Sequence, residues 1–135
     1  NILTKILLGN LALEKDEIVL VDTDAGVEHA GRKLEEVCDG LITVVDPTLE
    51  SLELALMLRE IALNLNKKFW VIANKVEGES ESLLKKEAER VGLKIDETVR
   101  FDQRLFLSCL RRKPLEADVA LADLKVTLKN LNIAP

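Results

Sequence analysis

Runs of consecutive apolar residues divide the chain at regular intervals. Residues 17–22 (EIVLVD), 40–46 (GLITVVD) and 68–74 (KFWVIAN) each end in a polar side chain, and a weaker run covers residues 93–99. Continuous rather than alternating hydrophobicity indicates strands buried on both faces, as in a parallel sheet covered by helices. The pattern therefore predicts three buried strands and a weaker fourth.

The segments around these runs have helical character. The strongest helix prediction is for residues 49–66, because apolar residues cover a broad face and Thr48 can cap the first turn after Pro47. The expected helices cover residues 2–13, 28–38, 49–66, 80–91, 102–112 and 116–131. Alternation of strands and helices implies right-handed crossovers, so we predict an α/β fold: a mostly parallel sheet with helices on both faces.

Composition narrows the class of protein. The 135 residues are 47% hydrophobic, enough for a core in about one small domain, and 19 basic against 24 acidic residues give a net charge of −5. Low aromatic content, 3%, and the acidic balance argue against a nucleic-acid partner, which would need basic clusters and stacking rings. Charges interrupt every long apolar stretch, so no membrane partner is expected. Two distant cysteines, Cys38 and Cys109, favour a reducing cytoplasm, and we expect both thiols to be buried.

Polar residues at the ends of the predicted strands form the candidate site, because open α/β sheets bind ligands at the carboxyl ends of their strands. The first strand runs into DTDAG, in which Asp22 can hold a water on Mg²⁺ and Gly26 lets the backbone approach a terminal phosphate. An ordinary acidic turn is the alternative interpretation. The third strand ends in Asn74 and Lys75, and an Asn amide offers a donor and an acceptor together to a base edge.

Three segments in this order resemble the MinD/ParA-type P-loop ATPases: VLVDTDAGVEHAGR, GLITVVDPTLESLELALML and FWVIANKV. Within that superfamily, residues 22–32 (DTDAGVEHAGR) are similar to the CooC-like accessory ATPases of carbon monoxide dehydrogenase maturation, which read D-x-x-A-G-x-E-H-x-G-R. The later VRFDQRL and KPL look like the I-P-x-D and G-x-P-L segments of the superfamily. The resemblance covers about residues 17–115.

The resemblance implies roles for individual residues. Asp22 matches the Mg²⁺-associated acid and Gly26 the glycine that senses the γ-phosphate. Asn74 matches the adenine-contacting Asn, with Lys75 beside it, and Asp102 lies in the loop that closes over the base. The residues that match the switch and subunit-interface stretch are Asp24, Glu28, His29, Gly31 and Arg32. The resemblance further implies ATP and Mg²⁺ as cofactors, a nucleotide-dependent homodimer, and a metalloenzyme client of the nickel or carbon monoxide dehydrogenase type.

The chain also departs from the superfamily pattern. A phosphate-binding loop of the K-G-G-x-G-K-[ST] type has no counterpart in these residues, so we expect residues 1–135 to be the C-terminal part of a single ATPase domain, without the strand that carries this loop. On its own, such a chain should bind nucleotide weakly and hydrolyse no ATP, because the backbone amides and the lysine of the loop supply most of the binding of the phosphates. The usual Pro of I-P-x-D is Arg100, and the metal-binding C-x-C pair is absent, so we predict no metal beyond Mg²⁺ at Asp22.

Two alternatives stay open from the residues alone. A MinD-like positioning ATPase would be favoured by a basic amphipathic C-terminal helix, which is not evident here. A receiver-like interaction domain would place acids and a lysine at successive strand ends, as Asp22, Asp46 and Lys75 do. Acetyl phosphate would label Asp46 of a receiver and would leave an ATPase fragment unlabelled.

Overall fold

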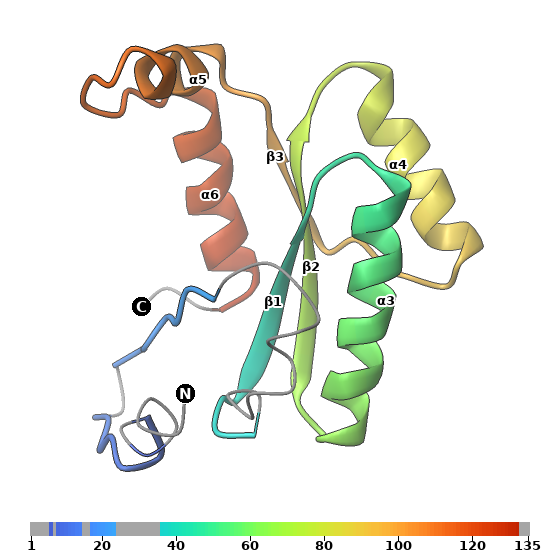
Figure 1. Ribbon diagram of the computed structural model, residues 1–135, viewed down its shortest axis with the longest axis vertical. Coiled ribbons are helices and arrows are strands. Elements are labelled where there is room, and N and C mark those ends of the chain that lie inside the picture. Colours follow the sequence, from blue (N-terminus) through green and yellow to red (C-terminus); the bar gives the residue numbers. More distant parts are fainter. Residues whose placement is uncertain (1–5, 7, 15–16, 24–35, 133–135) are drawn as a thin grey trace.

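The centre of the molecule is a parallel sheet of three strands. A computed structural model describes residues 6, 8–14, 17–23 and 36–132. In this part of the chain the sheet contains β1 (Gly40–Val45), β2 (Lys68–Val76) and β3 (Glu97–Arg100), in that spatial order (Figure 1). All pairings are parallel, with Gly40 opposite Lys68 and Val45 opposite Ala73. The carboxyl ends of the strands therefore meet at one edge of the sheet.

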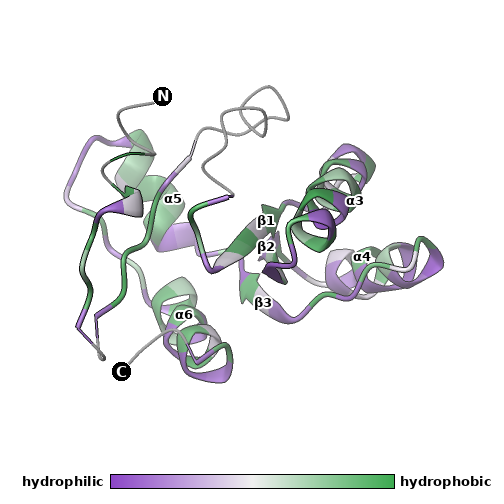
Figure 2. Cartoon of the chain, turned by 90° about the horizontal axis from the view of Figure 1, so that it is seen from below, coloured by the Kyte–Doolittle hydropathy of each residue, from purple (hydrophilic) through white to green (hydrophobic). Residues whose placement is uncertain are grey.

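Helices cover both faces of this sheet. Within residues 36–132 the helices are α3 (Leu49–Asn64), α4 (Glu79–Arg90), α5 (Gln103–Leu110) and α6 (Val119–Asn130). Seen from below, α3 and α4 lie on one side of the strands and α6 lies on the other (Figure 2). The α5 helix follows β3 beyond the carboxyl edge (Figure 1). The predicted α/β fold class is confirmed, and the arrangement is consistent with a P-loop NTPase-like fold.

The two faces of the sheet build two separate apolar clusters. Side chains of opposite parity along a strand point to opposite faces, so Val71 and Ala73 meet α3 and α4 while Ile72 meets α6. The larger cluster contains Val45, Leu52, Ala55, Val71, Ala73, Val76, Leu84, Ala88 and Leu93. The smaller cluster contains Ile72, Val99, Ala120 and Leu131, with Trp70 packed against it. Continuous hydrophobicity along β2 is thus explained by burial on both faces.

Local chemistry sets the limits of the best-predicted elements. Thr48 adopts an extended conformation and its side chain accepts a hydrogen bond from the Ser51 amide, which begins α3 as predicted. At the start of β1, Gly40 lies against the ring of Trp70: a Cβ there would come within 2.5 Å of the ring. The space at this position therefore suits glycine, which the sequence pattern alone did not indicate.

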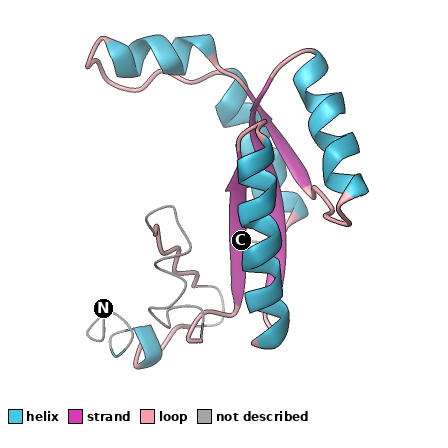
Figure 3. Ribbon diagram, turned by 45° about the vertical axis from the view of Figure 1, so that its right-hand side comes forward, coloured by secondary structure: helices cyan, strands magenta, loops and turns pink. Residues whose placement is uncertain are grey.

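Several expected elements are corrected by the structure. Residues 17–23 form no strand: they run outside the sheet as a loop (Figure 3), and Leu20 is 75% exposed. An apolar run becomes a strand only when a neighbour accepts its backbone hydrogen bonds and covers its side chains, and neither condition holds here. The weaker run at 93–99 forms a strand only from Glu97 onward, in β3, and Asp96 just before it hydrogen-bonds Val71 through its backbone amide and its carboxylate.

Other expectations at the N-terminal end have mixed outcomes. Of the helix expected at residues 2–13, positions 6, 8 and 9 are helical and residues 11–14 are not. The helix expected at 28–38 falls mostly outside the described residues, and residues 36–38 are not helical. Burial of both thiols is wrong for Cys109, which is exposed on α5, while Cys38 is half-buried. No helix in the described ranges is long and apolar enough to cross a membrane.

Candidate functional site

Three polar side chains meet at the carboxyl edge of the sheet. Asp46 directly follows β1, and Asn74 and Lys75 lie near the end of β2. The Lys75 ammonium Nζ lies 2.8 Å from Asp46 Oδ2, and the Asn74 amide Nδ2 donates to Asp46 Oδ1 at 3.3 Å. Parallel pairing of β1 with β2 brings these residues together from positions 28 and 29 residues apart in the chain.

The pairing of β2 with β3 contains a bulge at the two β2 residues of this site. Ala73 pairs with Thr98 and Val76 pairs with Arg100, so Asn74 and Lys75 together stand opposite the single intervening residue of β3. Bulges are rare in parallel pairs, and bulges in general re-aim side chains and are over-represented next to active sites. Regular alternation would point the side chains of two neighbouring residues to opposite faces, whereas Asn74 and Lys75 both contact Asp46.

Lys75 also has an unusual backbone conformation. Its φ is +55°, in the left-handed region, and the three other described non-glycine residues with positive φ, Asn66, Arg112 and Asn132, each follow a helix end. A left-handed residue after a helix is an ordinary termination, whereas one inside a strand is rare. Lys75 is the only case of this kind among the described strands.

The energetics of the Lys75–Asp46 pair favour a role other than stability. The Lys75 side chain is 58% exposed and the Asp46 side chain 41%, so their ion pair is worth roughly 0–1 kcal/mol. A non-glycine residue in the left-handed region costs about 1–2 kcal/mol. Since the cost equals or exceeds the gain, the fold maintains this geometry without being stabilised by it, and strain of this sort collects at functional sites.

Asp102 has an additional, structural role that sequence reasoning missed. Asp102 is only 6% exposed. Its Oδ1 accepts hydrogen bonds from the backbone amides of Arg104 and Leu105, and its Oδ2 accepts from those of Asp118 and Ala120. One carboxylate therefore joins the start of α5 to the start of α6. The Leu105 amide, followed by the others, holds the pKa of Asp102 below its usual range. A nucleotide contact of Asp102 stays a prediction.

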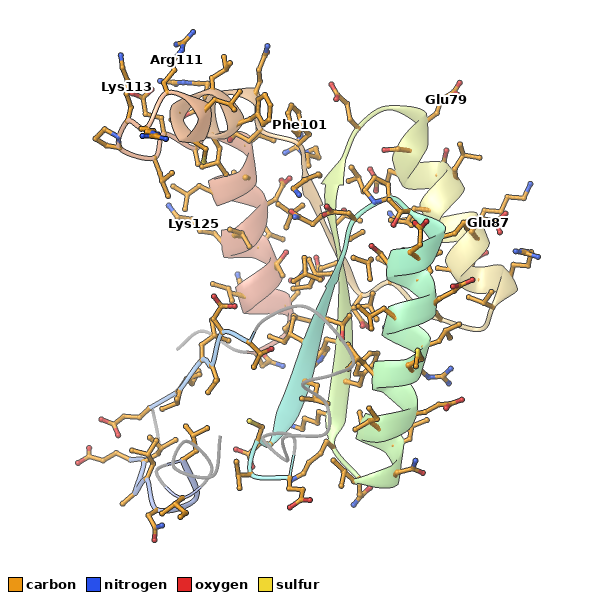
Figure 4. All side chains as sticks on the ribbon, in the orientation of Figure 1. Glu79, Glu87, Phe101, Arg111, Lys113 and Lys125 are labelled. Carbon is orange, nitrogen blue, oxygen red and sulfur yellow. The ribbon has the colours of Figure 1, made fainter. Side chains whose placement is uncertain are left out.

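Arg100, at the end of β3, links α6 to this strand. Its backbone amide and its Nε donate to Asp123 Oδ2 at 3.0 and 2.9 Å, and Nη2 donates to Oδ1 at 2.7 Å. This guanidinium lowers the pKa of Asp123. The next residue, Phe101, lies beyond the end of β3 (Figure 4), and its ring centre is 5.6 Å from that of Phe106 on α5. These contacts fix the loop that follows β3.

The other predicted site residues are not assembled with this group. Asp22 is exposed in the loop at 17–23, and in the described part of the chain no hydrogen bond or ion pair joins it to Asp46, Asn74 or Lys75. The predicted residues that lie outside the described ranges are Asp24, Gly26, Glu28, His29, Gly31 and Arg32. Nor do the described residues contain three or more His, Cys, Asp or Glu side chains grouped to hold a metal ion. Asp22 is the one predicted Mg²⁺-associated residue that lies in the described ranges, and this association stays a prediction.

Comparison with known proteins supports the resemblance. Over 120 residues the chain is 37% identical to the ATP-binding protein MJ0823 of Methanocaldococcus jannaschii. The aligned residues make up 87% of this chain and 47% of that protein. Over 77 residues it is 46% identical to MJ0084 of the same organism, covering 57% of this chain and 31% of the relative. Over 75 residues it is 37% identical to the carbon monoxide dehydrogenase accessory protein CooC of Rhodospirillum rubrum, and the aligned residues make up 55% of this chain and 28% of that protein.

The chain is similar to proteins named as ATP-binding and to a protein named CooC. The predicted resemblance to this group of MinD/ParA-type ATPases is therefore confirmed, although no family model matches the chain. The aligned part spans less than half the length of each of these relatives.

Asp46 was considered in the sequence only as a phosphoacceptor of the receiver alternative. Its contact with Asn74 and Lys75 was missed because no local pattern reports which strand ends become neighbours. The one available signal was the strand-end position shared by all three residues. The bulge had no sequence signal, since neither Gly nor Pro marks it.

Proposed function

We propose that this chain supplies the base-binding edge of an ATP-binding protein. The observation that carries this proposal is the bulge that presents Asn74 and Lys75 at the carboxyl edge of the sheet, with Asp46 as their shared partner. Ligands of open α/β sheets bind at this edge, and the Asn74 amide has the donor and acceptor that a purine edge requires. Relatives named as ATP-binding proteins support ATP as the nucleotide.

At the level of the whole protein, we propose a nucleotide-dependent homodimeric switch that assists the maturation of a metal centre in a client enzyme. Similarity to the carbon monoxide dehydrogenase accessory protein CooC supports this role over the positioning of cell components. In this proposal Asp22 is associated with Mg²⁺ and Gly26 senses the terminal phosphate. The residues that carry the state of the nucleotide to the partner subunit are Asp24, Glu28, His29, Gly31 and Arg32. The setting of the reaction would be the cytoplasm.

The test compares nucleotide binding by matched asparagine variants of the full-length gene product. Asn74→Ala removes the amide at the carboxyl edge, and we expect ATP affinity to fall about tenfold, the value of a good bidentate contact to a base. Asn130→Ala is the control, because Asn130 also donates through its side-chain amide, to Glu97, but lies near the amino ends of the strands. Titration calorimetry measures the affinity of each variant, and of the unaltered protein, for ATP.

Two results would contradict the base-binding role. One is an Asn74→Ala protein that binds ATP as tightly as the unaltered protein does. The other is an equal loss in the Asn130→Ala protein, which would indicate a general effect of the substitutions on folding. For residues 1–135 taken alone, we expect weak nucleotide binding and negligible ATP turnover, and saturable turnover would refute that expectation.

The receiver-like alternative is favoured by one observation, the Lys75–Asp46 ion pair at 2.8 Å. A receiver also needs paired acids at the end of its first strand, and residues 17–23, which contain Asp22, form no strand. Incubation with acetyl phosphate separates the two functions: a receiver gains phosphate that is lost in Asp46→Ala, and an ATP-binding protein gains none.

A further inference from the structure

The helix α5 and the loop after it project beyond the carboxyl edge of the sheet (Figure 1). We call residues 103–115 the α5 arm. Ser108 is the only buried residue of the arm, and Leu105 is the only one that packs against an apolar cluster of the sheet. The arm therefore adds little to the core of the molecule.

Hydrogen bonds nevertheless hold the α5 arm in one shape. The Ser108 hydroxyl donates to the Leu105 carbonyl at 2.8 Å and accepts from the Glu116 amide at 3.3 Å. At the end of the helix the Lys113 amide donates to the Ser108 carbonyl at 3.0 Å. A surface that is already ordered loses less entropy when a partner binds, so the arm is well suited to recognition.

The α5 arm is basic in an otherwise acidic chain. It contains four basic residues and no acidic one, whereas the whole chain has 19 basic against 24 acidic residues. The acids that follow the arm, Glu116 and Asp118, both form ion pairs with Arg104. The nearest carboxylates in the sequence are thus already paired at the start of α5.

Three cations at the other end of α5 have no acidic partner in the described part of the chain. Arg111, Arg112 and Lys113 are exposed, and no ion pair or side-chain hydrogen bond joins them to another described residue. Arg111 and Lys113 lie at the outer end of the arm (Figure 4). Cations at the C-terminal end of a helix interact favourably with its dipole, but that effect does not explain the apolar residues beside them.

Large apolar side chains of the α5 arm are also exposed. Phe106 is 48% exposed, Leu110 66% and Leu115 71%. Phe106 and Leu110 are four residues apart and therefore lie on the same face of α5. Aromatic residues and arginine are enriched in protein–protein interfaces, so this combination of residue types is typical of a surface that binds another protein.

We propose that the α5 arm docks a partner protein through an acidic segment that also carries apolar side chains. Charge complementarity decides the occupant, because carboxylates of the partner would pair with Arg111, Arg112 and Lys113. Apolar side chains of the partner would cover Leu110 and Leu115. Recognition of an anionic membrane by charge takes a cluster of about four to eight cations, more than are unpaired here. The inference does not depend on the proposed base-binding function.

The test measures binding of synthetic peptides to the full-length gene product by fluorescence anisotropy. The probe is a labelled helical peptide with leucine on one face and glutamate on the other. One comparison peptide has lysine in place of glutamate, and another has the residues of the probe in scrambled order. We expect the probe to bind and both comparison peptides to bind about tenfold more weakly or less.

Matched variants locate the binding on the arm. Arg112→Glu combined with Lys113→Glu should weaken binding of the probe about tenfold, because each change removes an attraction and adds a repulsion. Lys125→Glu combined with Lys129→Glu is the control: it changes the net charge equally, at two exposed positions of α6, and should leave the affinity unaltered. Leu115→Ser lies outside α5 and should also weaken binding while the helix stays intact.

Three results would overturn the proposal. The first is that the acidic peptide does not bind. The second is an equal loss of affinity in the two double variants, because the effect would then follow net charge alone. The third comes from vesicles of phosphatidylcholine and phosphatidylserine: if they bind the unaltered protein through Arg112 and Lys113 and the peptide does not, the arm recognises a membrane instead of a protein.

Discussion

Replacement of Thr127 by valine should stabilise the protein. Thr127 lies on α6, is 1% exposed, and its hydroxyl oxygen has no hydrogen-bond partner in the described part of the chain. A buried polar group without a partner costs about 1–3 kcal/mol of folding free energy. Thr127→Val exchanges this hydroxyl for a methyl group of similar size, and the helix propensities of the two residues are nearly equal.

We therefore expect the free energy of unfolding to rise by about 1 kcal/mol, the lower end of that penalty. In a protein of this size such a gain raises the melting temperature by roughly 3 °C. The assay is urea unfolding of the full-length gene product, followed by circular dichroism, with calorimetry as a second measurement.

A matched variant distinguishes the loss of the hydroxyl from a change in packing. Thr127→Ser keeps the hydroxyl and loses the methyl group, so it should be less stable by about 1 kcal/mol, the value of one buried methyl. If Thr127→Val is instead less stable than the unaltered protein, the hydroxyl has a partner and the reasoning fails. Such a partner would lie in residues outside the described ranges or in another subunit.

Two further predictions concern the start of β1 and the acid stability of the C-terminal helices. Gly40→Ala would place a methyl 2.5 Å from the Trp70 ring and should destabilise the fold by about 1–3 kcal/mol, with a shift in the fluorescence of this single tryptophan; unchanged fluorescence and stability would contradict it. Asp102 has its pKa lowered by the backbone amides it accepts from, and Asp123 has its pKa lowered by Arg100. Their stabilisation is therefore complete above the unfolded value of about 3.9 and is lost as the pH falls through the lower folded values. The urea midpoint of unfolding should decline in that acid range, and it should decline less steeply in Asp102→Asn. A midpoint that rises on acidification would contradict the expected direction of the pH dependence.

The helices and the central strands could be predicted because their signals are local. Thr48 caps α3 through the Ser51 amide three residues away, and the core run of β2 is apolar on both faces because both faces are covered. Such signals act within a few residues of one another, so a single sequence contains them in full.

The apolar run at residues 17–22 could not be predicted correctly from local hydrophobicity. Its composition is that of a buried strand, yet residues 17–20 are exposed and pair with no strand in the described part of the chain. A strand is stabilised by its neighbour, and the sequence of the strand does not say whether a neighbour is present.

By itself, the sequence determined the fold class, the order of most elements and the resemblance to ATP-binding proteins of the CooC-like group, because apolar periodicity and short motifs are properties of neighbouring residues. Only the tertiary structure decided that Asn74 and Lys75 occupy a bulge, that Lys75 is left-handed, and that both contact Asp46. These facts depend on the register between strands that lie far apart in the chain.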